Sequence, residues 1–299
     1  MNSVIESMLQ KYECQSTQDY KNALKEIIQE IALLGLYKAG FFRTAAFYGG
    51  SALRIFYGLE RFSEDLDFSL LKPDDKFSID DYTDAVKEEL AAYGFNMEVI
   101  KKVKAVDTNI DSAFIKGGTL YHLLQITSIK PPVSGVSENE MLKIKMEVDI
   151  NPPAGAHSEI KYSLIPIPYN LRIYTLSSLF AGKIYSILCR KWKTRIKGRD
   201  LFDYVWYLSN NVPVNLFHLS ERMKLSVHLE ESTALSFELL QELLAEKFSI
   251  IDFKQAVNDV KVFIKDQRQL DVWSADFFKT ITKDKLKSVD SEKQDSGSC

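Results

Sequence analysis

The sequence is poor in the residues that build disulfide frameworks and zinc sites. Its three cysteines, Cys14, Cys189 and Cys299, are odd in number and far apart. That pattern excludes a disulfide framework and fits no common zinc spacing. The four histidines are scattered, and none has a cysteine close to it in the sequence. Neither a zinc site nor a catalytic Cys/His pair is therefore predicted.

Long apolar runs and an excess of one charge are also missing. The apolar runs fall far short of the ~20 residues that a membrane-spanning helix needs. The first residues lack the basic segment followed by an apolar one that marks a secretory signal peptide. The 38 Lys and Arg against 41 Asp and Glu give a net charge of −3, so nucleic-acid binding would require a local basic patch. We expect a cytoplasmic protein with no membrane partner.

Helical and strand-like periodicities alternate in the first half of the chain. Apolar residues at helical spacing predict helices over 17–37, 51–57 and 78–93. Period-two or β-branched patterns predict strands over 65–70, 96–104, 112–128 and 142–150. This order predicts an α/β (α+β) fold, with a mixed sheet and flanking helices over residues 1–170.

The second half is mostly helical. The expected helices are 176–191, 200–210, 215–224, 230–246 and 253–265. We therefore predict a helical C-terminal domain over residues 171–282. The last residues, 283–299, are polar and are expected to form a disordered tail.

A glycine pair carries the first chemical signal. Gly49, Gly50 and Ser51 stand where the apolar stretch 45–48 turns into the predicted helix. Glycines let backbone N–H groups approach an anion, a helix N-terminus adds partial positive charge, and a serine hydroxyl can donate to a phosphate oxygen. The turn suits the β- and γ-phosphates of a nucleotide. A plain tight turn is the alternative.

Paired carboxylates follow. Asp65 and Asp67 lie two residues apart in a predicted strand and so share one face, where like charges repel unless a cation lies between them. Such hard oxygen ligands suit Mg²⁺ or Mn²⁺. Asp149, at the end of the strand 142–150, is the candidate third ligand, and Glu147 on the same face is its rival. A solvated strand face is the alternative.

Two blocks together resemble a known family. The string Gly49-Gly-Ser-Ala-Leu-Arg54, followed by Arg61-Phe-Ser-Glu-Asp-Leu-Asp-Phe-Ser69, is similar to the AbiEii/AbiGii toxins of the DNA polymerase β-like nucleotidyltransferase superfamily. The family's Ala-x-Lys helix and Arg-Asp-Leu-Tyr-Asp-like stretch correspond to Lys183, Arg199, Asp200 and Asp203.

The resemblance implies transfer of a nucleoside monophosphate from an NTP to an acceptor, in a cleft between the two halves. Asp65, Asp67 and Asp149 would hold Mg²⁺ or Mn²⁺, and Lys183 would neutralise charge on the triphosphate. Either Asp200 or Asp203 would orient Lys183 or an arginine. The resemblance also implies a toxin of a toxin–antitoxin or phage abortive-infection system, with an antitoxin encoded nearby and tRNA as acceptor.

A basic segment supplies a candidate acceptor site. Residues 183–199 hold seven basic residues and no acidic one. An RNA backbone could bind to its members Arg190, Lys191, Lys193, Arg195, Lys197 and Arg199. A solvated basic helix and loop is an equal alternative. Two other functions stay open: nucleotidyl transfer to a protein or to a small molecule such as an aminoglycoside, and NTP binding without catalysis.

Overall fold

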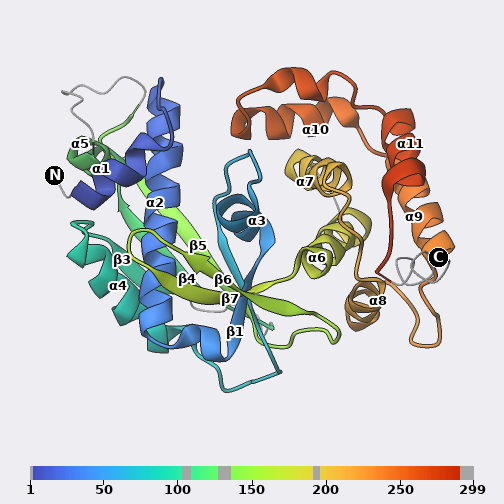
Figure 1. Ribbon diagram of the computed structural model, residues 1–299, viewed down its shortest axis with the longest axis horizontal. Coiled ribbons are helices and arrows are strands. Elements are labelled where there is room, and N and C mark those ends of the chain that lie inside the picture. The colour runs from blue at the N-terminus through green and yellow to red at the C-terminus, as the bar shows by residue number, and fades with distance from the viewer. Residues whose placement is uncertain (1–2, 103–108, 127–135, 191–195, 290–299) are drawn as a thin grey trace, which may run out of the picture. The chain divides into compact units, whose positions relative to one another are not determined.

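The computed structural model describes residues 3–102, 109–126, 136–190 and 196–289, and Figure 1 shows its elements. The chain divides into two compact units. Unit 1 comprises Met1–Gly58, Phe62–Pro152 and Ile160–Ile173. Unit 2 comprises Leu59–Arg61, Pro153–Glu159 and Tyr174–Cys299.

Unit 1 is built on a mixed seven-stranded sheet in the order β3-β4-β5-β2-β1-β7-β6. The strands are β1 (Ala45–Tyr48), β2 (Leu66–Leu70), β3 (Glu98–Lys101), β4 (Ile110–Gly118), β5 (Met141–Asp149), β6 (Ser158–Ser163) and β7 (Tyr169–Tyr174). β2 pairs antiparallel with β1 and parallel with β5, so the middle of the sheet mixes both directions. This arrangement confirms the predicted fold class.

Helices and short 3₁₀ turns flank the sheet. They are α1 (Ser3–Gln10), α2 (Thr17–Lys38), η1 (Phe41–Arg43), α3 (Gly49–Tyr57), η2 (Ile79–Tyr82), α4 (Thr83–Ala92) and α5 (Thr119–Ile126). α2 begins at a capping box in which the Ser16 side chain accepts from the Asp19 backbone and Asp19 accepts from Ser16. α2 runs alongside α4 and contacts β5, as Figure 1 shows.

One face of the sheet forms the core of unit 1. Leu66 and Phe68 of β2 and Met146 and Val148 of β5 are all buried. Phe68 lies with its ring centroid 5.0 Å from that of Phe41, in an edge-to-face arrangement that aromatic pairs favour. Because side chains alternate along a strand, the residues between these apolar ones point to the opposite face. Asp67 and Glu147 therefore share that opposite face.

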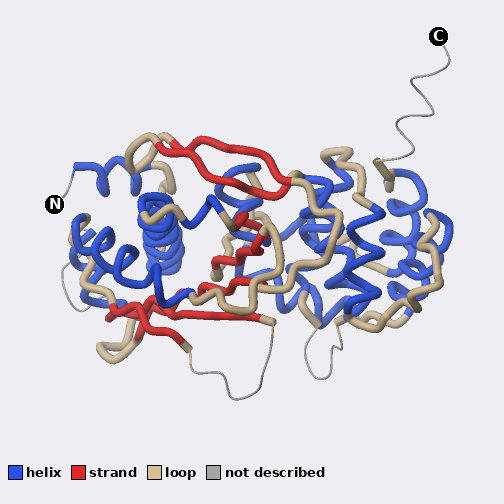
Figure 2. Tube along the Cα trace, turned by 90° about the horizontal axis from the view of Figure 1, so that it is seen from below, coloured by secondary structure: helices blue, strands red, loops and turns tan. Residues whose placement is uncertain are grey.

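Unit 2 is mostly helical. Its helices are α6 (Leu176–Cys189), α7 (Gly198–Ser209), α8 (Leu216–Leu225), α9 (Phe237–Ser249), α10 (Phe253–Val260) and α11 (Ala275–Lys285), with η3 (Lys261–Phe263) and η4 (Gln267–Leu270) between them. Figure 2 shows these helices in blue, joined by loops. Side-chain caps mark four of the starts: Asn215, Ser236, Asp252 and Ser274 each accept from a backbone N–H. None of the helices in the described ranges combines the length and hydropathy that a bilayer crossing needs.

Aromatic side chains and one close backbone contact hold unit 2 together. The rings of Phe180 and Tyr207 stack with centroids 4.5 Å apart, and Tyr204 is fully buried. α7 starts at Gly198, whose N–H donates to Asp259 of α10 at 3.0 Å. A Cβ on Gly198 would collide with the backbone carbonyl of Ala256. The glycine is what lets α7 approach α10 so closely.

Most of the expected elements are present, with one wrong assignment. The strand predicted over 112–128 ends at Gly118, and α5 begins at the next residue. Gly117 lies against the sulfur of Met97 and the ring of His122, where a Cβ would clash. The strand therefore ends at a glycine pair whose first member is packed against α5, and the apolar residues after the pair belong to a helix.

Four helices and strands of the described chain have no counterpart in the sequence prediction: α1, β6, β7 and α11. The predicted tail also begins too early. α11 runs to Lys285, Leu286 and Ser288 are buried, and Ser288 pairs with Val214 in an isolated bridge. Residues 290–299 lie outside the described part of the chain.

Substitution by alanine should change the free energy of unfolding in opposite directions at Gly182 in α6 and at Gly198 at the start of α7. Gly198→Ala should lower the free energy of unfolding by about 1–3 kcal/mol, because its Cβ meets the Ala256 carbonyl. Gly182→Ala is the control, since nothing lies within 4 Å of its Cβ position in the middle of α6. It should stabilise the protein by up to about 1 kcal/mol. Equal effects in denaturant unfolding would contradict the close approach of α7 to α10.

Candidate active site

The glycine turn connects β1 directly to α3. α3 begins at Gly49, whose φ of 83° lies in the left-handed region that non-glycine residues avoid. The N-cap residue, Tyr48, makes no side-chain capping hydrogen bond to the start of the helix. The backbone N–H groups of such a helix start are the groups that can bind an anion.

Gly49 lies directly against one of the paired carboxylates. A Cβ at this position would overlap the carboxylate of Asp67 and approach its Cβ to 3.1 Å. β1 and β2 pair antiparallel with Tyr48 opposite Asp67, and this register brings the turn and the aspartate together. The structure therefore joins the two sequence motifs within unit 1.

The Ser51 hydroxyl is not available for a phosphate oxygen in the way that the sequence motif suggests. Its side chain is fully buried, and its hydroxyl donates to the backbone carbonyl of Asp65. This bond ties the first turn of α3 to the segment that enters β2. In this arrangement the Ser51 hydroxyl positions Asp65, while the backbone N–H groups of Gly50 and Ser51 remain at the helix start.

Asp65 and Asp67 are both half-buried at the head of β2. Asp65 directly precedes the strand, and Asp67 lies within it, between the fully buried Leu66 and Phe68. The two carboxylates therefore leave the sheet on the face away from the core. Within the described residues, no group of three His, Cys, Asp or Glu side chains is gathered closely enough to hold a metal ion.

The two rivals for the third carboxylate differ in their surroundings. Glu147 lies opposite Asp67 in the parallel β2–β5 register, but its carboxylate is 2.5 Å from the Lys145 ammonium. Asp149 lies opposite Ser69 at the end of β5. It is largely buried, and it accepts the N–H of Asn151 at 3.1 Å. Both residues are on the Asp67 face of the sheet.

In unit 2, Lys183 lies in a buried ion cluster. Its ammonium is 2.7 Å from Asp200 and 2.8 Å from Asp203. Arg61 binds both oxygens of Asp203, at 2.5 and 2.6 Å, and Arg190 binds Asp200 at 2.8 Å. Both Asp200 and Asp203 are thus engaged, each with two cations. A role for Arg61 could not be predicted from the sequence, because no local pattern links it to a residue more than a hundred positions away.

The opposite charges of this cluster keep one another ionised. Burial alone would lower the pKa of Lys183, but Asp200 and Asp203 raise it above its ordinary value. Burial alone would raise the pKa of Asp200, but Lys183 and Arg190 hold it below its ordinary value. Lys183 and Asp200 are therefore ionised at neutral pH. Removing one partner of such a buried pair costs roughly 3–5 kcal/mol, because the other charge is left uncompensated.

The basic segment is only partly described. Lys191, Lys193 and Arg195 lie outside the described residues. Arg190 is held by Asp200, and the Arg199 guanidinium lies 4.2 Å from the centroid of the Phe263 ring. Lys197 occupies the N-cap position of α7. Arg190 and Arg199 thus have partners inside unit 2.

The sequence as a whole identifies the class of protein to which this turn and carboxylate pair belong. Residues 31–280 match the family described as nucleotidyl transferase AbiEii toxin, type IV toxin–antitoxin system, and the chain belongs to that family. It is a nucleotidyltransferase and a toxin, and its family implies an NTP substrate and an antitoxin partner. The predicted resemblance is confirmed.

Solved structures and curated proteins add little to this assignment. JHP933 from Helicobacter pylori is 18% identical, with 95% of this chain and 97% of that chain covered and a TM-score of 0.49. An antigenic nucleotidyltransferase-like protein from Paracoccidioides brasiliensis is 15% identical, with 81% and 94% covered and a TM-score of 0.39. No curated protein matches the sequence.

Alanine at the glycine turn should separate backbone strain from the carboxylate contact. Gly49→Ala and Gly58→Ala both place a side chain at positive φ, which costs about 1 kcal/mol of stability in each case. Only Gly49→Ala also displaces Asp67, since nothing lies within 4 Å of a Cβ on Gly58. We expect both variants to lose stability but only Gly49→Ala to lose nucleotidyl transfer. Full activity of Gly49→Ala would contradict the coupling.

Proposed function

We propose that unit 1 binds an NTP at the glycine turn, with a divalent cation on Asp65 and Asp67, and that the nucleoside monophosphate is transferred to an RNA acceptor such as the 3′ end of tRNA. The contact between Gly49 and Asp67 carries this proposal, because it puts a helix start beside a carboxylate. Phosphate binding and cation binding are then neighbouring functions of one turn.

The donor chemistry fits Mg²⁺ or Mn²⁺. Asp65, Asp67 and Asp149 offer hard carboxylate oxygens, which these ions prefer, and none of them is a soft sulfur or imidazole ligand. Two carboxylates two residues apart repel each other, and a cation between them would relieve that repulsion. When bound, such an ion would stabilise negative charge on the triphosphate and lower the pKa of the acceptor hydroxyl.

The residues of the chain would then act as follows. The N–H groups of Gly50 and Ser51 would bind phosphate oxygens, and Ser51 would hold Asp65 through the bond described above. The acceptor oxygen forms a bond to the α-phosphorus, the bond from that phosphorus to the β-phosphate bridging oxygen breaks, and pyrophosphate leaves. Asp149 would take the proton of the acceptor hydroxyl.

The role of Lys183 on the triphosphate stays a prediction. Its raised pKa keeps it cationic, which favours such a role. Its ammonium is already bound by Asp200 and Asp203, however, so Lys183→Ala would also leave two buried carboxylates with less compensation. A loss of NTP affinity in that variant counts for the role only if its free energy of unfolding is preserved.

Removing either paired carboxylate should abolish the reaction and leave the fold intact. Asp65→Asn and Asp67→Asn should each lower transfer of labelled nucleotide to total tRNA by about 100-fold or more, the upper range for residues that merely support a metal ligand. Stability should be unchanged or slightly higher, because like-charge repulsion is relieved. Asp75→Asn, at an exposed position, is the control for the change in charge.

The destination of the label decides the proposal. Label on tRNA that needs Mg²⁺ or Mn²⁺ supports it, and label on protein, or near wild-type transfer by either variant, contradicts it. Asp149→Asn and Glu147→Gln distinguish the two rivals for the third carboxylate. We expect the first to be inactive and the second to be active, because Lys145 already binds Glu147. The reverse result would assign the role to Glu147.

The basic segment should bind RNA through its phosphates. Replacing Lys191, Lys193, Arg195 and Lys197 with Gln should weaken RNA binding. The slope of log affinity against log salt should become shallower by up to about 3.6, because each neutralised phosphate contributes ~0.7–0.9 to that slope. NTP affinity should stay unchanged. A matched variant makes the same substitution at four exposed lysines of unit 1: Lys72, Lys76, Lys87 and Lys102. Equal salt slopes in the two variants would contradict an RNA site in this segment.

A further inference from the structure

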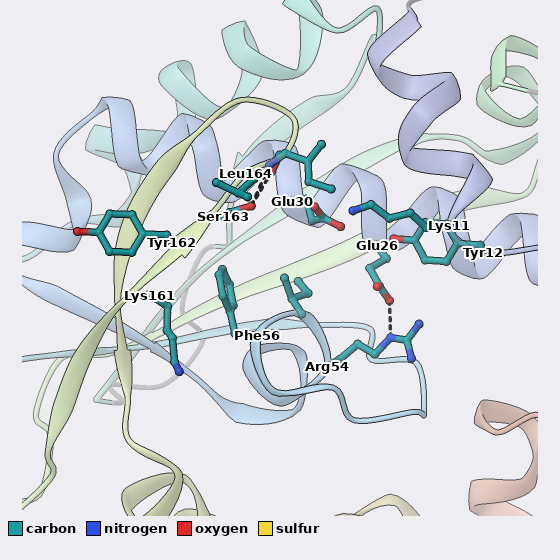
Figure 3. A pocket seen from close by; sticks show the side chains of 12 residues that line it. Lys11, Tyr12, Glu26, Glu30, Arg54, Phe56, Lys161, Tyr162, Ser163 and Leu164 are labelled. Carbon is teal, nitrogen blue, oxygen red and sulfur yellow. Dashed lines mark hydrogen bonds and ion pairs between the residues drawn. The ribbon is translucent and has the colours of Figure 1, made fainter.

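A cavity in unit 1 is not used by any of the steps above. It has a volume of about 420 Å³, which lies in the range of small-molecule sites. Figure 3 shows its lining, which comes from the segment after α1, from α2, from α3 and from the end of β6. The lining residues that matter here are Lys11, Tyr12, Glu26, Glu30, Arg54 and Phe56.

Two of the cationic side chains of the lining are already engaged. The Arg54 guanidinium binds Glu26 at 2.9 Å, as the dashed line in Figure 3 shows, and lies 4.5 Å from the centroid of the Phe62 ring. The Lys161 ammonium lies 4.8 Å from the centroid of the Tyr57 ring. Arg54 therefore compensates the second carboxylate of the cavity, Glu30, only in part, because its ion pair is with Glu26.

Glu30 is the group that the cavity leaves electrostatically incomplete. It is only 6% exposed, and within the described residues no Lys, Arg or His nitrogen lies within 4.0 Å of its carboxylate. Burial, opposed by Lys11, raises the pKa of Glu30 to about 7. A buried carboxylate is costly unless a cation compensates it, so a cationic ligand would gain from reaching Glu30.

We propose that this cavity binds a small organic amine, with the ammonium group against Glu30 and the apolar body against Phe56, Leu164 and Ile165. Tyr12, whose side chain points toward Glu26 and Glu30 in Figure 3, adds an aromatic surface to the same wall. An anionic ligand would meet two buried carboxylates, Glu26 and Glu30, in the same cavity. The lining does not include Asp65 or Asp67, and the proposal does not depend on the proposed acceptor.

The test measures how tightly three probes of similar shape bind to the full-length protein. 2-Phenylethylamine, 2-phenylethanol and 3-phenylpropionate differ mainly in the charge of the head group. In calorimetric titration we expect the amine to bind once per chain and at least tenfold more tightly than the other two. Equal binding of the alcohol, or preference for the carboxylate, would overturn the proposal.

Variants locate the bound amine. Glu30→Gln should weaken amine binding at least tenfold, whereas Glu88→Gln, an exposed glutamate of α4, should leave it unchanged. Leu164→Arg is a second cavity variant that keeps the test valid if Glu30→Gln does not fold. Leu164 is 73% exposed at the cavity, so a polar side chain is tolerated there. The added cation should weaken amine binding at least threefold. Unchanged affinity in both cavity variants would refute the site.

The pH dependence gives a readout that a purely structural glutamate would not produce. The charged and titratable groups that face Glu30 are Lys11, Tyr12, Glu26, Arg54 and Tyr169. Burial raises the pKa values of both tyrosines, so neither ionises between pH 6 and 8. With a Glu30 pKa of about 7, amine affinity should rise about tenfold over this interval as the carboxylate ionises. Glu30→Gln should abolish that rise, and a pH-independent wild type would contradict the role of Glu30.

Discussion

The candidate active site depends on one close contact, that of Gly49 with the carboxylate of Asp67. The turn needs a residue that adopts φ of 83° and that has no Cβ, and glycine alone satisfies both conditions. The contact fixes where α3 starts relative to β2, and the Ser51 hydroxyl then holds the Asp65 carbonyl. Helix start and carboxylate pair therefore form one rigid corner, which is the preorganisation that a phosphate-transfer site requires.

The constraint in unit 2 is electrostatic rather than steric. Asp203 is completely buried and binds both Arg61 and Lys183, while Asp200 binds Lys183 and Arg190. Each carboxylate is shared between two cations, so the loss of any member leaves a buried charge poorly compensated. This explains how a lysine can be nearly buried and still carry full charge. The activity of a Lys183 variant is therefore read together with its free energy of unfolding.

The sequence predicted those features that depend on residues close together in the chain. The glycine turn, the short helix ended by Gly58, and the Asp65–Asp67 strand were all found this way, because turn chemistry and strand alternation are local. The contacts between them were not predicted. Whether the Ser51 hydroxyl meets a phosphate or the Asp65 carbonyl depends on how α3 packs against β2, and the pairing of Arg61 with Asp203 spans 142 positions. The strand predicted beyond Gly118 was wrong for a related reason, since the apolar residues after it form α5, which packs against Gly117 through His122.

α3 connects the two parts of unit 1 that we have assigned to ligands. Its first residue, Gly49, touches Asp67, while Arg54 and Phe56 line the cavity that contains Glu30. The helix is only nine residues long, and an ion pair joins its Arg54 to Glu26 of α2. A helix this short moves as a unit, because its backbone hydrogen bonds leave little freedom to bend. An amine that shifts Arg54 or Phe56 would therefore act on the same rigid element that positions the glycine turn, whereas one that leaves them in place would bind without effect on it.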